Sequence, residues 1–173
     1  MKELVRLFVQ IAFMRKGPQD LPASATLLAA TAFGYFLVNC LVSAVLPPIK
    51  GPWFAHLVVD VLFTFAWYAL LLTILRRPER FVQTTTAVFG YQAVIAPFWI
   101  ASVWLIRQFA EDDAWRFPVV IIGLGIVVWL VAANARVLKA ALDWAMPASV
   151  ALVILQILGG QALLVYLFPG RGS

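Results

Sequence analysis

The chain has 173 residues, of which 64% are hydrophobic and 12% are charged, whereas a soluble domain is typically about 45–50% apolar and about 25% charged. This composition leaves no room for a sizeable soluble domain and indicates a membrane protein. The net charge of +5 does not indicate a nucleic-acid partner, because the basic residues lie at the ends of apolar runs, as in membrane proteins. The single cysteine, Cys40, excludes an intrachain disulfide.

Residues 1–22 have the pattern of a short amphipathic helix followed by a break. A mostly apolar stripe is formed by Leu4, Leu7, Phe8, Ile11, Phe13 and Met14. The polar side is formed by Lys2, Arg6, Gln10, Arg15 and Lys16. This pattern predicts a helix that lies in the cytoplasmic membrane interface. Gly17 and Pro18 are expected to end it.

A secretory signal peptide is the alternative interpretation of this segment. The small residues at 23–25 imitate a cleavage site after a basic start and an apolar stretch. We favour the interfacial helix, because Arg15, Lys16 and Asp20 separate that site from the apolar stretch, which a signal peptide would not tolerate.

Five apolar runs follow, and each reaches the roughly twenty residues that a helix needs to cross a bilayer. They occupy residues 23–46, 54–75, 81–106, 118–142 and 147–168. The predicted fold class is therefore all-α: a polytopic membrane protein with five transmembrane helices in a single bundle at 23–168. The interfacial segment 1–22 precedes this bundle, and a short tail at 169–173 follows it.

Helix caps and breakers separate these runs. Either Asp20 or Ser24 is expected to cap the first span. Prolines and glycines at residues 47–52 predict the first outer loop, and residues 77–80 predict a tight inner turn that makes the second and third spans antiparallel neighbours. Tryptophans fall at the expected water boundaries, as interfacial aromatic residues do: Trp53, Trp104, Trp115 and Trp144.

The basic residues predict an orientation. Nine of the 13 Lys and Arg residues fall on one side of this layout: Lys2, Arg6, Arg15, Lys16, Arg76, Arg77, Arg80, Arg136 and Lys139. Because Lys and Arg are retained on the cytoplasmic face, the N-terminus is predicted to be cytoplasmic and the C-terminus to lie outside.

Part of this basic side forms a rim that predicts contact with anionic lipid headgroups. The rim consists of Arg15, Lys16, Arg76, Arg77 and Arg80. Orientation of the protein is a sufficient alternative explanation for these charges. Asp143 is expected to pair with Lys139, one helical turn away.

Asp60 is the acidic residue buried in the middle portion of a predicted span, and His56 lies four residues earlier on the same helical face. Ionisable groups in hydrocarbon usually face protein or water and find a partner. One interpretation is that the two residues relay a proton or hold a cation. The simpler one, which we favour, is that Asp60 is hydrogen-bonded within the bundle and His56 lies near the outer headgroups. A lone His and Asp are too few ligands for a transition-metal site, so no metal is predicted.

Polar or irregular residues from every span fall at one depth, roughly 10 Å from the outer helix ends: Asn39, Asp60, Pro97, Gly125 and Gln161. This layer is either a packing core in which Asn39 and Gln161 satisfy Asp60, or the floor of a cavity. Packing is the favoured alternative. Pro97 also predicts a kink in the third span near Ala93. Glycines at 123, 125, 159 and 160 and the small pair Ala30 and Gly34 predict close helix packing.

The sequence has no nucleophile elbow, phosphate-binding glycine loop, paired-cysteine metal site or intramembrane HExxH. We therefore predict a protein that is not an enzyme and has no cofactor.

Residues 15–24 (RKGPQDLPAS) and 80–90 (RFVQTTTAVFG) resemble segments of small proteobacterial inner-membrane proteins. The layout of five spans with a cytoplasmic N-terminus is also similar to that of the Yip family of membrane-trafficking proteins and its bacterial relatives. Eukaryotic Yip proteins have a longer N-terminal region associated with small-GTPase partners, and that role does not carry over to this chain. The resemblance implies a non-enzymatic protein of the bacterial inner membrane whose bundle engages lipids or other membrane proteins.

The function predicted from sequence is that of an organising or accessory membrane component, with membrane lipids, other membrane proteins or a second copy as partners. The alternative is a small transporter or channel subunit that uses the outer polar layer around Asp60. A lipid-modifying enzyme is the least favoured of the three hypotheses.

Overall fold

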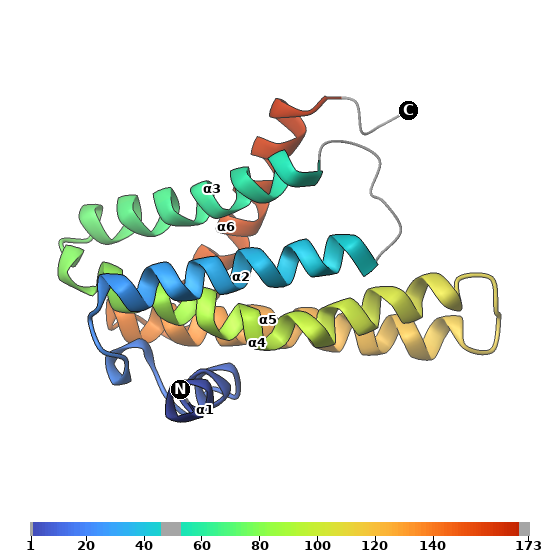
Figure 1. Ribbon diagram of the computed structural model, residues 1–173, viewed down its shortest axis with the longest axis horizontal. Helices are drawn as coiled ribbons and strands as arrows, with labels where there is room; N and C mark the ends of the chain where they lie inside the picture. The colour runs from blue at the N-terminus through green and yellow to red at the C-terminus, as the bar shows by residue number, and fades with distance from the viewer. Residues whose placement is uncertain (1, 46–52, 170–173) are drawn as a thin grey trace.

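The computed structural model describes residues 2–45 and 53–169, which form helices joined by turns (Figure 1). In chain order the elements are α1 (Lys2–Ala12), the 3-10 turn η1 (Pro18–Asp20), α2 (Ala25–Val45), α3 (Trp53–Ile74), the 3-10 turn η2 (Pro78–Arg80), α4 (Phe81–Gln108), α5 (Arg116–Leu142) and α6 (Met146–Leu167). The all-helical class predicted from the sequence is confirmed for this part of the chain. The predicted outer loop at 47–52 lies outside the described residues.

Four helices are long and apolar enough to cross a membrane: α3, α4 with its preceding turn, α5 and α6. They end within two residues of the predicted spans. The length and composition of these four helices are those of a helical membrane protein. Helix α2, with 21 residues, is a further apolar helix that lies beside α4 (Figure 1).

Helix α4 occupies the centre of the bundle and contacts α1, α2, α3 and α5. Its residues 84–91 are all buried. In this stretch Thr85 Oγ1 donates to the carbonyl of Phe81 at 2.8 Å, and Thr86 Oγ1 donates to that of Val82 at 2.6 Å. These bonds back to the helix are how threonine hydroxyls are satisfied in apolar surroundings. The helix continues through Pro97 to Gln108, so the kink near Ala93 stays a prediction.

Helix α1 packs across α4 and α5 (Figure 1). The aromatic ring of Phe8 lies directly against Gly90, where the missing side chain leaves room for it. Trp129 Nε1 donates a 2.8 Å hydrogen bond to the carbonyl of Ala12. Phe8, Ile11 and Ala12 are buried in these contacts, so this part of the apolar stripe faces protein and not the membrane. The interfacial location of α1 stays a prediction.

The connector between α1 and α2 is fixed by local caps. Ser24 Oγ accepts a hydrogen bond from the Leu27 N–H at 3.3 Å, so Ser24 caps α2. Asp20 instead accepts from the Gly17 N–H at 2.9 Å and from Lys16 Nζ at 3.3 Å. Both residues are candidate caps by sequence, and in the structure Ser24 is the one that caps α2.

The two ends of the bundle differ in charge. At one end α2 begins, α3 ends, α4 begins and α5 ends; we call it the basic end, because it carries Arg15, Lys16, Arg77, Arg80, Arg136 and Lys139. The opposite end carries the start of α3 and the connection between α4 and α5. The four tryptophans expected at water boundaries are all exposed at their positions.

A candidate intramembrane binding site

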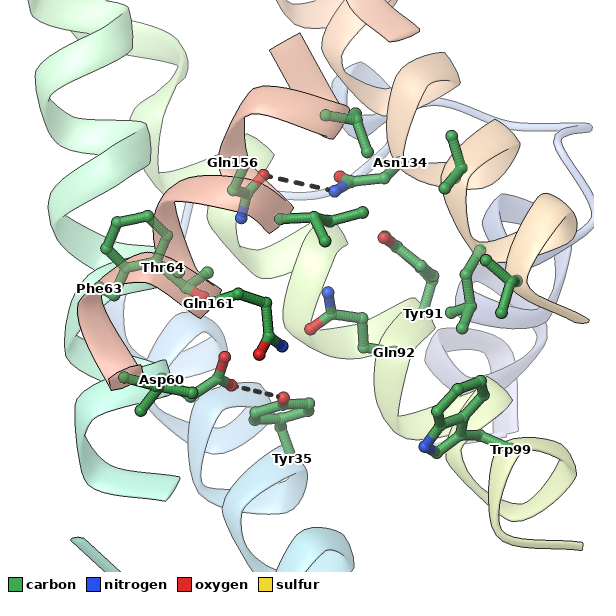
Figure 2. A pocket seen from close by; sticks show the side chains of 17 residues that line it. Tyr35, Asp60, Phe63, Thr64, Tyr91, Gln92, Trp99, Asn134, Gln156 and Gln161 are labelled. Atoms are coloured by element: carbon green, nitrogen blue, oxygen red, sulfur yellow. Dashed lines mark hydrogen bonds between the residues drawn. The ribbon is translucent and has the colours of Figure 1, made fainter. Parts of the chain in front are cut away.

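A cavity of about 320 Å³ lies between the five long helices, and each of them contributes residues to its lining (Figure 2). Its polar members are Tyr35, Asp60, Thr64, Tyr91, Gln92, Asn134, Gln156 and Gln161. The remainder is aromatic and aliphatic, with Phe63 and Trp99 as the largest side chains. A mostly apolar pocket with a few convergent polar groups is the usual form of a small-molecule site.

Asp60 supplies the carboxylate of the cavity. It lies on α3 and accepts a 2.8 Å hydrogen bond from the hydroxyl of Tyr35 on α2 (Figure 2). The Tyr35 ring is held in turn against the Phe89 ring of α4, with the ring centroids 5.3 Å apart. Asp60 is half-buried and borders the cavity, so part of its surface is available to a ligand. A charge in this low-dielectric setting interacts strongly with any ion that reaches it.

A second set of polar side chains joins α3, α5 and α6 beside the cavity. The hydroxyl of Tyr68 lies 2.8 Å from Asn134 Oδ1 and 3.1 Å from Gln156 Oε1, and it donates its one proton to these two acceptors. Asn134 Nδ2 lies 3.5 Å from the same Gln156 oxygen (Figure 2). Tyr68 is fully buried. Asn134 and Gln156 border the cavity while holding the three helices together.

Two further amides extend into the space between these groups. Gln161 on α6 and Gln92 on α4 point toward each other across the cavity, with Gln161 next to the pair Asp60 and Tyr35 (Figure 2). Gln161 can approach α3 because a Cβ at Gly160 would lie only 3.3 Å from the Phe63 ring. The small residues of α6 therefore bring its amide to the cavity, as their predicted role in close packing implies.

The structure brings together only part of the layer predicted from the sequence. Among the described residues that line the cavity, Asp60 and Gln161 belong to that layer, whereas Asn39, Pro97 and Gly125 lie elsewhere. The Asp60 carboxylate is bonded to Tyr35, and its pairing with Asn39 and Gln161 stays a prediction. Asn39 donates through Nδ2 to the backbone carbonyl of Tyr35 at 2.9 Å.

His56 lies apart from the cavity, although it shares a helical face with Asp60. It is buried, and its ring meets the Phe168 ring edge-on with centroids 4.3 Å apart. Phe168 follows α6 directly, so this contact closes the opposite end of the bundle between α3 and α6. The imidazole is not among the described side chains that border the cavity. A relay through His56 and Asp60 therefore gains no support from this arrangement.

Six polar residues of this region were not predicted from the sequence: Tyr35, Tyr68, Tyr91, Gln92, Asn134 and Gln156. Asn134 and Gln156 had a usable signal, because an amide in the interior of an apolar span needs a partner. The tyrosines had a weaker one, since a phenol is also common in packed helices. A prediction based on depth alone gives a single layer, whereas the residues that line the cavity lie at several depths along the helices.

Of the predicted basic rim, Arg76 is exposed in the turn after α3, and the other four residues divide into two parts. Arg77 and Arg80 both pair with the Asp143 carboxylate, at 3.1 and 3.0 Å. The expected pair of Asp143 with Lys139 is wrong, because Asp143 leaves the helical conformation at φ 58° and its side chain turns toward the start of α4. Arg15 and Lys16 lie instead around a separate hollow with the end of α5.

These features define the class of protein as a helical membrane protein with a polar cavity inside its bundle. Among the described residues, no three His, Cys, Asp or Glu side chains are grouped to hold a metal ion. No family model, curated protein or solved structure matches the chain.

Proposed function

We propose that this chain is a five-span protein of the bacterial inner membrane with a cytoplasmic N-terminus. The 21 residues of α2 correspond to a length of about 30 Å, which equals the hydrocarbon thickness of a typical bilayer. Adding α2 to the four other spans places the basic end on one side of the membrane. The retention of Lys and Arg in the cytoplasm assigns that side to the cytoplasm.

We further propose that the cavity binds a small organic cation and that the protein acts as a small transporter or channel subunit. The observation that carries this proposal is the Asp60 carboxylate, held by Tyr35 at 2.8 Å and bordering a cavity to which all five long helices contribute. Ionisable residues inside a membrane typically mark ion or substrate pathways. A conformational change of the bundle would alter several walls of this cavity at once.

The chemistry of the lining favours a cationic solute with hydrogen-bonding groups. Asp60 supplies one negative charge, and the amides of Gln92 and Gln161 both donate and accept hydrogen bonds. Trp99 also lines the cavity, and a tryptophan ring is the best partner for a cation–π contact. The volume of about 320 Å³ is near the lower limit of ligand pockets, which span roughly 300–1,000 Å³. A small primary or quaternary amine fits these conditions.

The organising or accessory role expected from the sequence depends on small-residue helix faces that meet other proteins. Gly159 and Gly160 instead face Phe63, and Gly123 faces Ile106, within the same chain, whereas no atom lies within 4 Å of the Cβ position at Gly34 or Gly125. The use of the first three glycines inside the bundle favours the cavity as the functional feature. An accessory role, like the resemblance to Yip proteins and the absence of enzymatic activity, stays a prediction.

Ligand-dependent thermal stabilisation of the purified protein tests the proposal. A panel of small amines, with sugars and carboxylates of equal size as negative controls, should contain at least one amine that raises the unfolding temperature. Asp60→Asn should abolish that shift, and Asp113→Asn, at an exposed acid in the connection between α4 and α5, should preserve it. A stabilising amine whose effect survives Asp60→Asn would refute the proposed site. A panel without any stabilising amine would refute a cation site altogether.

A further inference from the structure

A second hollow, of about 460 Å³, lies at the basic end of the bundle. The connector after α1 forms one side of it, and the last turns of α5 form the other. Four basic side chains line it: Arg15, Lys16, Arg136 and Lys139. Arg136 and Lys139 are one turn apart on α5, so both project from the same helical face. Residues separated by more than 100 positions thus place cations around one space.

The acidic residues of this hollow are already engaged. Asp20 is bonded to Lys16 at 3.3 Å and to the Gly17 N–H at 2.9 Å. Asp143 is bonded to Arg77 and Arg80. Within the described part of the chain, no ion pair involves Arg15, Arg136 or Lys139. The hollow therefore presents an excess of positive charge to an incoming ligand.

An adjoining hollow of about 340 Å³ supplies hydrogen-bonding groups. It shares Gln19, Ala140 and Asp143 with the hollow of about 460 Å³. Thr84 of α4 lines it, is fully buried, and has no hydrogen-bond partner for its hydroxyl among the described residues. Buried hydroxyls nearly always have a partner. A hydroxyl in a hollow that adjoins the one lined by these three cations suits a ligand that combines an anionic group with further oxygen atoms.

We propose that this basic pocket binds the phosphate headgroup of an anionic phospholipid. Trp144 also lines the pocket, and tryptophan is enriched at the level of lipid headgroups. The position at the end of the membrane-crossing helix α5 places the cations at that same level. Basic pockets between transmembrane helices on the cytoplasmic side are typical sites for anionic headgroups. This site is independent of the cavity around Asp60, since the two share no residue.

The basic residues that line this pocket differ from those of the predicted lipid-binding rim. The sequence placed Arg77 and Arg80 in the lipid-binding rim, but these two hold Asp143 and the end of α5. Arg136 and Lys139 take their place beside Arg15 and Lys16. The proposal is thus a defined site for one headgroup, in contrast to a diffuse rim of charge.

Native mass spectrometry of the purified full chain tests this inference, with phosphatidylglycerol, phosphatidylcholine and inorganic phosphate as probes. Phosphatidylglycerol should bind more tightly than phosphatidylcholine. The triple variant Arg15→Gln, Arg136→Gln, Lys139→Gln should weaken its binding by about a hundredfold, because each well-placed cation contributes about 1 kcal/mol. A matched triple variant, Lys2→Gln, Arg6→Gln, Arg116→Gln, removes the same charge outside the pocket and should retain the affinity. Arg15→Lys, Arg136→Lys, which keeps the charge, should retain most of it.

Three results would overturn the proposal. Equal losses in the pocket variant and in the matched variant would show that only net charge matters. Unchanged affinity in the pocket variant would place the lipid elsewhere. Inorganic phosphate that binds as tightly as phosphatidylglycerol, and displaces it, would identify a soluble phosphate compound as the ligand in place of a lipid.

Discussion

The hydroxyl of Tyr35 on α2 donates a 2.8 Å hydrogen bond to the carboxylate of Asp60 on α3. This bond connects two mostly apolar helices, and it satisfies one oxygen of an acid that hydrocarbon would penalise. Phe89 of α4 holds the Tyr35 ring in place. The carboxylate is thus positioned before any ligand arrives, which reduces the cost of binding one.

Tyr35→Phe tests the contribution of this bond. The variant removes the hydroxyl but keeps the ring against Phe89, so we expect a loss of about 1 kcal/mol in the free energy of unfolding. A double-mutant cycle with Asp60→Asn, measured by thermal unfolding in detergent micelles, isolates the pairwise energy. A coupling energy of zero would mean that the two residues are neighbours without a stabilising bond.

A larger loss of stability is expected when the Tyr68 hydroxyl is removed. Tyr68→Phe leaves the oxygens of Asn134 and Gln156 without their common donor in a fully buried place. Loss of a buried partner costs about 1–3 kcal/mol, so we expect a clear fall in the unfolding temperature. Tyr166→Phe removes the same hydroxyl from a side chain that is 82% exposed and should leave the temperature unchanged. Equal effects of both variants would contradict the role assigned to Tyr68.

The positions of the helices could be predicted from the sequence, whereas most of the cavity could not. Apolar runs determine where α3 to α6 begin and end, and Asp60 was recognisable because a carboxylate in such a run is costly. In a soluble helix the apolar stripe also identifies the buried face. An apolar helix such as α2 has no single apolar stripe, so its sequence does not say that Tyr35 faces α3.

Contacts that depend on how the helices cross could not be predicted from the sequence either. His56 and Asp60 share a helical face by their spacing, but His56 contacts Phe168 because of where α6 ends. The amphipathic pattern of α1 predicts a buried face without identifying what covers it. Here α4 and α5 cover it, because Gly90 leaves room for Phe8. A membrane surface would accept the same pattern.

Gly90→Ala should displace α1. A Cβ at this position would overlap the Phe8 ring, and the ring must then rotate or move away together with α1. Labelling of a cysteine placed at the buried Ala12 position should become faster in the Gly90→Ala protein, after Cys40 has been replaced. Gly34→Ala is the matched control, since no atom lies within 4 Å of its Cβ position. Restoration of slow labelling by adding Phe8→Ala would confirm the cause.

Asp20 predicts a pH dependence of the connector. The hydrogen bond from the Gly17 N–H, and next the contact with Lys16, lower the pKa of this carboxyl below its usual 3.8. A lowered pKa in the folded state stabilises the fold above the unfolded-state pKa, and that contribution is lost as the pH falls below about 4. The contribution stays under about 1 kcal/mol, because Asp20 is largely exposed and screened.

Asp20→Asn isolates this charge, because the amide oxygen still accepts the hydrogen bond from Gly17. We expect the variant to be less stable than the original chain at pH 7 and the difference to be smaller near pH 3, as measured by thermal unfolding across that range. A stability difference that is the same at both pH values would show that the ionised form has no special role.

Arg80 has a structural role that distinguishes it from its neighbour Arg77. It donates to the carbonyls of Ala140 and Ala141 at 3.1 and 2.9 Å, which belong to the last turn of α5, and also to Asp143. Such carbonyls lack partners within the helix, and a cation there also interacts favourably with the helix dipole. Among the described residues, the Arg77 guanidinium forms an ion pair with Asp143 only, and it does so at the surface.

Arg80→Gln should therefore lower the free energy of unfolding by about 1–2 kcal/mol, since it removes charge-assisted bonds from a partly exposed site. Arg77→Gln should cost less than about 0.5 kcal/mol, and high salt should remove most of that cost. Thermal unfolding at low and high salt separates the two cases. Equal losses of stability in the two variants would contradict the structural role assigned to Arg80.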